Sequence, residues 1–99
     1  MPVTSAMIWI IDTIKTHLFI QEADYDLDVP IQVEIEYRVR DKEVSLSSVS
    51  KKIYYNRPLL VKEAKNFSEE EIDKLINQSV QKAIENHFTA KGYTFNRTI

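Results

Sequence analysis

The sequence predicts an α+β fold, in which an antiparallel β-meander carries a long C-terminal helix packed on one face. Apolar and polar residues alternate from Asp24 to Arg40, and apolar residues recur at spacings of three and four from residue 69 to residue 90. A period of two is typical of a strand with one buried face, and a period near 3.6 of an amphipathic helix. The length of 99 residues fits one domain, so we expect a single domain over residues 1–99.

The N-terminal segment, Met7 to Gln21, is compatible with a strand or a helix. A strand would bury Ile8, Ile10, Ile14, Leu18 and Ile20, and a helix would bury Met7, Ile10, Ile11, Ile14 and Leu18. Its Ile and Thr content favours the strand, because branched side chains lose rotamer freedom in helices. The alternative fold has two helices on a long β-hairpin. In the strand interpretation, Trp9, Ile11 and Phe19 lie opposite the core and need a cover.

The segment Asp24 to Arg40 is predicted as one long strand, followed by a turn at Asp41-Lys42 and a returning strand. A two-residue turn pairs apolar residues with apolar residues and an arginine with a glutamate. The expected pairs are Val39 with Val44, Tyr37 with Leu46, and Arg40 with Glu43. Beyond Leu46 the apolar parity switches, which predicts a bulge near Ser47-Ser48. Pro30 lies on the polar parity and cannot donate a ladder hydrogen bond, which indicates an edge position or a bulge.

The returning strand is expected to stop near Pro58, with Leu59, Leu60 and Val61 as a possible continuation. Its register would lay residues 56–60 beside residues 24–28, so that basic and acidic groups partly neutralise each other across the sheet.

The C-terminal helix has explicit signals at both ends. Ser68 fits the N-cap, Glu71 completes a capping box, and Phe67 with Ile72 forms a hydrophobic staple. Gly92 fits the left-handed residue that follows a helix, with Tyr93 folding back on the last turn. We therefore expect a helix over about residues 69–90, and the tail after it is compatible with a short strand.

Composition excludes several classes of site. The chain has no Cys, one Gly and a net charge of −2. It therefore has no disulfide scaffold, thiolate zinc site, catalytic thiol or glycine-rich phosphate cradle. The near-neutral charge argues against a strongly cationic DNA-coating protein. The start of the sequence has no basic region before its short apolar run, so we expect a soluble, intracellular protein without a membrane span.

Two charged clusters deserve a functional interpretation. Asp24, Asp26 and Asp28 would line one face of a strand about 6–7 Å apart, where they could hold a divalent cation weakly. The EF-hand pattern fails here, and a solubilising edge is the simpler interpretation. The second cluster, Lys51 to Lys65, is the candidate nucleic-acid surface, because cations contact phosphates and aromatic rings stack on bases. Its proposed contact residues are Lys51, Lys52, Arg57 and Tyr54.

The remaining reactive residues predict no catalytic site and no cofactor. His17 lies on the polar parity of the first strand, and His87 continues the apolar stripe of the helix. Neither has a partner at metal-ligand spacing, so no metal is expected. The serines between residues 45 and 50 lack a nucleophile elbow and fit the wet side of a strand.

The chain resembles the small uncharacterised proteins that filamentous viruses of acid-loving archaea encode, such as the Acidianus filamentous viruses. The resemblance covers the whole chain in length and texture: no Cys, the single Gly92, and the Ile-rich segment Ile8–Ile20. It implies a viral protein in the host cytoplasm that is thermostable and tolerates acid, and it assigns no functional residue.

From these patterns we expect a non-enzymatic binding or assembly protein, and a homodimer. The candidate contact residues are Trp9, Phe19, Tyr54 and Tyr55, because tyrosine and tryptophan are frequent interface anchors. The alternative is a nucleic-acid-binding accessory protein that uses the basic stretch 51–65. The effect of salt concentration on binding distinguishes these two functions, since phosphate contacts weaken steeply with salt and apolar contacts do not.

Overall fold

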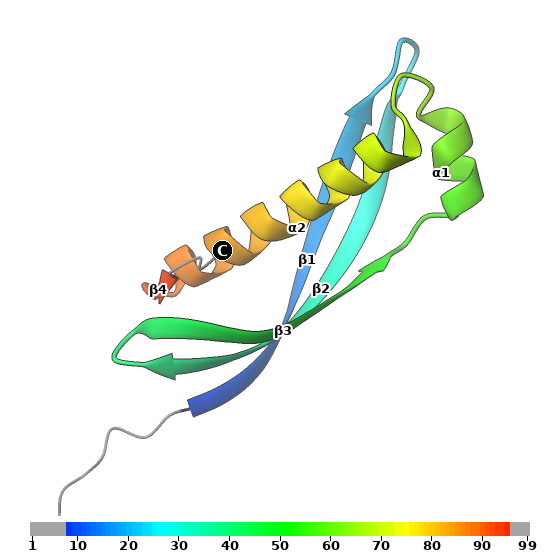
Figure 1. The fold of residues 1–99 in the computed structure, drawn as a ribbon. Coiled ribbons are helices and arrows are strands. Elements are labelled where there is room, and N and C mark those ends of the chain that lie inside the picture. The colour runs from blue at the N-terminus through cyan, green and yellow to red at the C-terminus, as the bar shows by residue number, and fades with distance from the viewer. Residues whose placement is uncertain (1–7, 96–99) are drawn as a thin grey trace, which may run out of the picture.

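The computed structural model describes residues 8–95 and has the expected α+β fold (Figure 1). The elements are β1 (Ile8–Gln21), β2 (Asp26–Arg40), β3 (Glu43–Ile53), α1 (Arg57–Glu63), α2 (Glu69–Ala90) and β4 (Thr94–Phe95). The four strands form one sheet with the order β1-β2-β3-β4, in which β4 is parallel to β3 and the other pairs are antiparallel. The predicted meander with a long C-terminal helix is thus confirmed.

The N-terminal segment is a strand, so the alternative of two helices on a hairpin is wrong. β1 pairs with β2 along its whole length, from Ile8 opposite Val39 to Gln21 opposite Asp26. Side chains of even-numbered β1 residues from Ile10 to Ile20 face the core, and Ile20 is buried there, whereas Ile8, which was expected to be buried, is 57% exposed. Met7, where the segment was expected to begin, lies outside the described residues.

The β2–β3 hairpin has the predicted register. Val39 pairs with Val44, Tyr37 with Leu46, and Arg40 with Glu43. Asp41 and Lys42 have φ angles of 50° and 66°. Positive φ at both central residues is the requirement of a tight turn that matches strand twist. The register shifts between Glu36 and Tyr37, opposite the predicted bulge at Ser47-Ser48.

The prediction of a strand that runs to Pro58 and possibly continues is wrong. β3 ends at Ile53, and residues 57–63 form the short helix α1. The Asn56 side chain accepts a hydrogen bond from the backbone N–H of Leu59 at 3.0 Å, and Pro58 occupies the first turn. Proline is favoured there because the first helical N–H groups have no helical acceptor. Residues 56–60 therefore do not lie beside residues 24–28, and the neutralising pairing expected there does not form.

Pro30 lies in β2, which is an inner strand of the sheet, so an edge position for the whole strand is wrong. The bulge also lies elsewhere. Pairing with β3 ends at Ile31 opposite Ile53, and Tyr54 N–H then donates to Pro30 O at 2.9 Å. The proline thus lies where β3 leaves β2. Its missing N–H therefore does not interrupt the ladder of hydrogen bonds between these two strands.

The ends of α2 confirm the predicted caps. Ser68 and Glu71 form a capping box, with distances of 3.0 and 3.1 Å between each backbone N and the side-chain oxygen of the other residue. After the helix, Gly92 has a φ of 75°, and Tyr93 N–H donates to Phe88 O at 3.0 Å. This is the left-handed C-terminal motif that favours glycine. The predicted short strand after it is β4.

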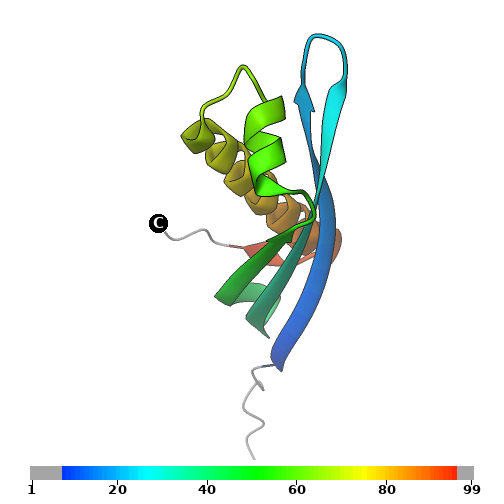
Figure 2. The same ribbon diagram turned by 90° about the vertical axis from the view of Figure 1, so that its right-hand side faces the viewer.

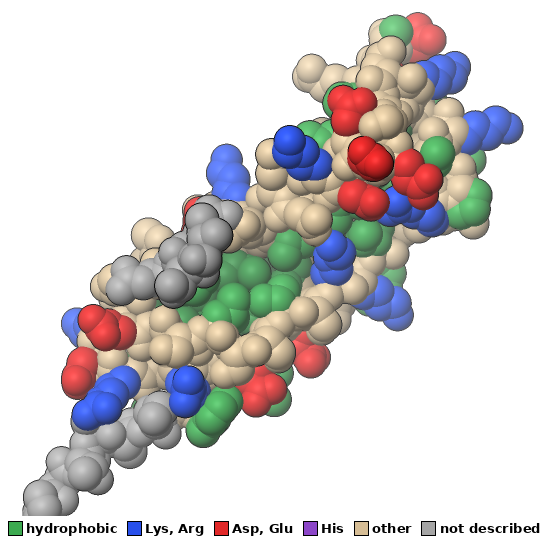
Figure 3. All heavy atoms as spheres, viewed as in Figure 1, with side chains coloured by type: hydrophobic (Ala, Val, Ile, Leu, Met, Phe, Trp, Pro, Cys, Tyr) green, Lys and Arg blue, Asp and Glu red, His purple; other side chains and the backbone are tan. Residues whose placement is uncertain are grey.

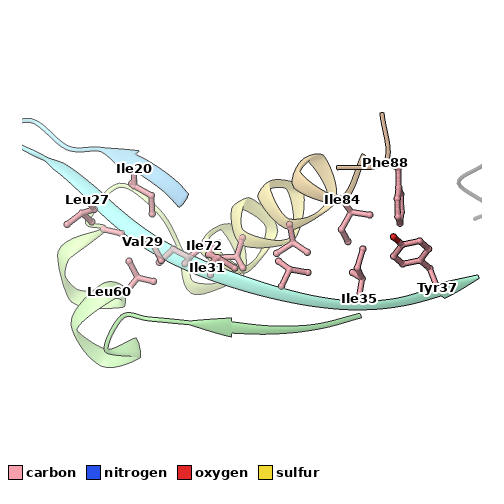
Figure 4. Packing of buried hydrophobic residues seen from close by; sticks show 14 of the residues in the cluster. Ile20, Leu27, Val29, Ile31, Ile35, Tyr37, Leu60, Ile72, Ile84 and Phe88 are labelled. Carbon is pink, nitrogen blue, oxygen red and sulfur yellow. The ribbon is translucent and has the colours of Figure 1, made fainter. Parts of the chain in front are cut away.

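The core lies between the sheet and α2, with α1 closing one end (Figure 4). α2 runs along β1, because Ser79 contacts the carbonyl of His17 and His87 contacts Asp12. At the far end, the rings of Tyr37 and Phe88 pack edge to face, with centroids 4.8 Å apart. Figure 2 shows both helices on the same side of the sheet. We call this side the inner face and the opposite side the outer face.

Candidate interaction surface

The outer face consists of odd-numbered residues of β1, even-numbered residues of β2 and their neighbours on β3. No helix among residues 8–95 covers it (Figure 2). In contrast to a buried sheet face, it carries large apolar side chains that remain more than half exposed. These are Trp9 at 58%, Ile11 at 65% and Phe19 at 63%. Trp9 and Ile11 lie at one end of this face and Phe19 at the other, and large apolar side chains left exposed on a small protein commonly mark an interaction site.

Trp9 and Phe19, the aromatic residues near the two ends of β1, both contact neighbouring side chains on the outer face. The guanidinium carbon of Arg38 lies 5.1 Å from the ring centroid of Trp9, a cation–π contact. The ring of Phe19 stacks on that of His17, with centroids 5.9 Å apart and an interplanar angle of 11°. Nδ1 of His17 lies 2.7 Å from Oδ1 of Asp28. Rings that are already ordered lose less conformational entropy when a partner packs on them.

Tyr54 extends the outer face beyond the end of β3. Its ring is 49% exposed, its hydroxyl donates to Oε1 of Gln32 at 3.2 Å, and Nζ of Lys52 lies 5.2 Å from the ring centroid. A shallow hollow of about 320 Å³ lies beside it, and Lys15, His17 and Pro30 contribute to its walls. Trp9, Phe19 and Tyr54, which the sequence singled out as contact residues, therefore share one face.

Tyr55, the fourth contact candidate, lies on the other side of the sheet. Its side chain is half-buried and packs against the core, and its hydroxyl donates to Oε1 of Glu63 at 3.1 Å. Burial and the Glu63 carboxylate both raise the pKa of Tyr55. This tyrosine joins α1 to the end of the sheet, so the outer face does not contain it.

The residues of the basic candidate surface do not converge. Lys51 lies on the inner face and donates to Asn77 of α2, whereas Lys52 lies on the outer face over Tyr54. Arg57 forms ion pairs with Asp73 at 2.7 Å and Glu69 at 3.2 Å. These hydrogen bonds raise the pKa of Arg57. A phosphate would have to displace two carboxylates to reach this guanidinium.

The acidic candidate surface is also divided. Asp24 lies in the β1–β2 connection, and Asp26 and Asp28 lie on the outer face. Asp28 is already engaged by His17. Within residues 8–95, no group of three or more histidine, aspartate or glutamate side chains could hold a metal ion.

Sequence reasoning missed a polar cluster on the inner face. Asp12 occupies a core-facing position of β1, where Tyr37 OH donates to its Oδ2 at 2.6 Å and His87 Nε2 lies 2.8 Å from the same atom. Burial raises the pKa of Asp12, but these hydrogen bonds outweigh it and hold the pKa below 3.8, the ordinary value. The available signal was a single charged side chain among the core-facing residues of β1, which are otherwise apolar except for Thr16.

A second apolar area lies on the inner face beside β3. Because α2 follows β1, the inner side of β3 is only partly covered, and Val49 is 44% exposed there. Figure 3 shows hydrophobic side chains in this region, framed by charged ones. Among residues 8–95, no aromatic side chain facing this inner area is as exposed as Trp9 or Phe19.

These features define a small α+β protein whose most distinctive surface is an uncovered sheet face with ordered aromatic ends and a charged centre. No protein-family model, curated protein or solved structure was found to match the chain. None of the helices between residues 8 and 95 is long and apolar enough to cross a membrane.

Proposed function

We propose that this chain is a non-enzymatic binding or assembly protein that self-associates through its outer face. The observation that carries the proposal is the exposure of Trp9, Ile11 and Phe19 on the sheet face opposite both helices. Burying such side chains releases roughly 25 cal/mol for each Å² of apolar surface removed from water. Given the resemblance to archaeal virus proteins, we propose that the chain is a viral protein that acts inside the host cell.

The alternative function, nucleic-acid binding through residues 51–65, has weaker support. It requires a continuous cationic surface, because affinity for nucleic acid comes from several phosphate contacts made together. Lys51 and Lys52 lie on opposite faces, and Arg57 already has two carboxylate partners. Self-association is therefore the function that we propose.

The test is the solution mass by light scattering across a concentration series, for the wild-type chain and three variants. We expect a wild-type dimer, and dimers weakened at least about tenfold in Trp9→Ser and Ile11→Ser, because central apolar anchors dominate interfaces. Val49→Ser is the matched control, since it removes an exposed strand side chain from the inner face. Circular dichroism verifies that each variant is folded.

Three results would overturn the proposal. The first is a wild-type monomer at high micromolar concentration. The second is a dimer that Val49→Ser dissociates and Ile11→Ser does not, which would move the interface to the inner face. The third is a mass that rises only with added DNA and falls back in salt, which would favour the basic stretch.

A further inference from the structure

The charges at the centre of the outer face are arranged in adjacent rows across the strands. Glu34 of β2 lies between Thr13 and Ser50. One row further along the same face, Gln32 lies between Lys15 and Lys52. An acidic row is thus followed directly by a row with two cations.

These charges have no ionic partners of their own. No ion pair among residues 8–95 involves Glu34, Lys15 or Lys52. Arg38 faces Trp9, and its Nε is buried without a hydrogen-bond acceptor among the same residues. A surface that is left with separated, unpaired charges can be complementary to a partner that presents the reverse order.

We propose that the partner is a second copy of this chain, packed face to face with its strands antiparallel to those of the first. The twofold axis lies in the interface, perpendicular to the strands, and passes between the row of Glu34 and the row of Gln32. This inference rests on the proposed function and specifies its geometry. The order of the rows is reversed in the second copy, so each row meets a different row.

The reversal brings together groups that attract each other. Glu34 of each copy faces the row with Lys15 and Lys52 of the other. Trp9 on β1 of one copy faces Phe19 on β1 of the other. On the neighbouring strand β2, Arg38 of one copy faces Asp28 of the other. Aromatic pairs and opposite charges each stabilise such a contact.

The apolar side chain between these groups also finds a complementary position. Ile11, the most exposed of the outer-face apolar residues, faces His17 of the other copy, beside the shallow hollow that Pro30 and Tyr54 line. An aliphatic side chain that enters a recess is a common anchor of protein interfaces.

Other twofold arrangements of the same face bring like charges together. An axis through the row of Glu34 stacks Glu34 on itself, and an axis through the row of Gln32 stacks Lys15 on itself. An axis parallel to the strands places Lys15 over Lys52. Like charges placed opposite each other disfavour association, so charge selects the axis between the two rows.

Pairing through the free edge of β1 is less favourable than face-to-face packing. The hydroxyl of Ser79 on α2 donates to the backbone carbonyl of His17 at 3.5 Å, so α2 lies against this edge of the sheet. A strand added there would meet α2. On the outer face, ten residue steps and three strands give a flat footprint of about 33 Å by 14 Å, or roughly 900 Å² from the two copies together, which is the size of a weak interface.

The test is a charge-swap experiment with two variants, Glu34→Lys and the double variant Lys15→Glu/Lys52→Glu. Each variant alone places like charges opposite each other in the two central rows, and we expect each to dimerise at least about tenfold more weakly than wild type. Mixed in equal amounts, the two variants match acidic groups with basic ones. We expect the mixture to form a heterodimer, which native mass spectrometry identifies by its mass when one of the two variants is uniformly labelled with ¹⁵N.

The control is Glu70→Lys, a charge reversal of the same size on the exposed first turn of α2, which should leave the dimer unchanged. If wild type dimerises, Trp9→Ser dissociates it and both swapped variants still dimerise as wild type, the proposed axis is wrong and self-association through the outer face stands. A mixture that stays monomeric also overturns the axis. A monomeric wild type overturns the proposed function itself.

Discussion

The hydroxyl of Tyr37 donates a hydrogen bond of 2.6 Å to Oδ2 of Asp12 across the β1–β2 pair. His87 of α2 reaches the same oxygen at 2.8 Å, so one carboxylate joins two strands and the helix. Tyr37 is fully buried. Burial and the Asp12 carboxylate both raise the pKa of Tyr37 well above its usual range, which favours the protonated phenol as the donor.

Replacing Tyr37 with Phe should destabilise the fold by about 1.5–2 kcal/mol, because it removes a donor to a partly buried carboxylate. Urea denaturation at neutral pH measures this loss. Tyr54→Phe is the control, since its hydroxyl bonds Gln32 on the exposed outer face and should cost less than about 0.5 kcal/mol. Equal losses in the two variants would contradict a structural role for the Asp12 contact.

Asp12 should make stability depend on acid pH. Its pKa is lower in the folded chain than its ordinary value of 3.8, so the unfolded chain binds a proton first as pH falls. The stabilising contribution is therefore complete above about pH 5 and is lost as pH falls through the folded pKa. The difference in unfolding free energy between wild type and Asp12→Asn should shrink from pH 7 to about pH 2.

Comparing the two proteins at each pH isolates Asp12 from other acids. Glu71 and Asp73 also have lowered pKa values, from the Ser68 and Arg57 contacts respectively, and both are present in wild type and variant. A difference that stays constant over this pH range would show that Asp12 does not titrate in the way its contacts predict.

Lys42→Gly should stabilise the chain by about 1 kcal/mol. Lys42 has a φ of 66°, a conformation in which a side chain crowds the backbone and glycine does not. Its carbonyl accepts a hydrogen bond from Thr94 N at 2.7 Å, and glycine retains that acceptor. Ser45→Gly, in the adjoining strand, should instead destabilise by about 0.5–1 kcal/mol. Thermal melts of both variants check this, because the melting temperature should rise in Lys42→Gly and fall in Ser45→Gly.

Gly92→Ala should destabilise the chain by about 1 kcal/mol through the backbone alone. Gly92 has a φ of 75°, and an added Cβ would meet no atom within 4 Å, so no steric clash contributes. Gly92→Asn should cost less, because asparagine tolerates the left-handed conformation. Chemical denaturation measures the unfolding free energy of both variants. Equal losses in Gly92→Ala and Gly92→Asn would contradict a cost that arises from the left-handed backbone conformation.

Local patterns were sufficient to predict most of the fold. The alternation in β2, the β-branched content of β1, the turn at Asp41-Lys42 and the capping box at Ser68 each depend on neighbours within a few residues. The bulge near Ser47-Ser48 followed from the switch of apolar parity. These features are encoded locally because they arise from backbone geometry and from side chains that are close in sequence.

Helix α1 was missed because Leu59-Leu60-Val61 is too short a run to distinguish a strand from a helix. Tertiary structure resolved the ambiguity. Leu60 is fully buried in the core, and Tyr55 on the preceding segment bonds Glu63 of α1. Asn56 caps α1 because β3 stops at Ile53 and leaves the following residues free to turn into a helix.

Of the candidate site, the sequence alone determined that Trp9, Ile11 and Phe19 share one face if residues 7–21 form a strand, and the Ile and Thr content favoured the strand over the helix. Only the tertiary structure decided that both helices lie on the inner face, that Tyr55 turns inward, and that Lys51 and Lys52 separate. It also joined Asp12 to Tyr37 and His87, which are 25 and 75 residues away. Periodicity specifies the direction of a side chain from its own backbone, whereas contacts between distant segments depend on how the whole chain packs.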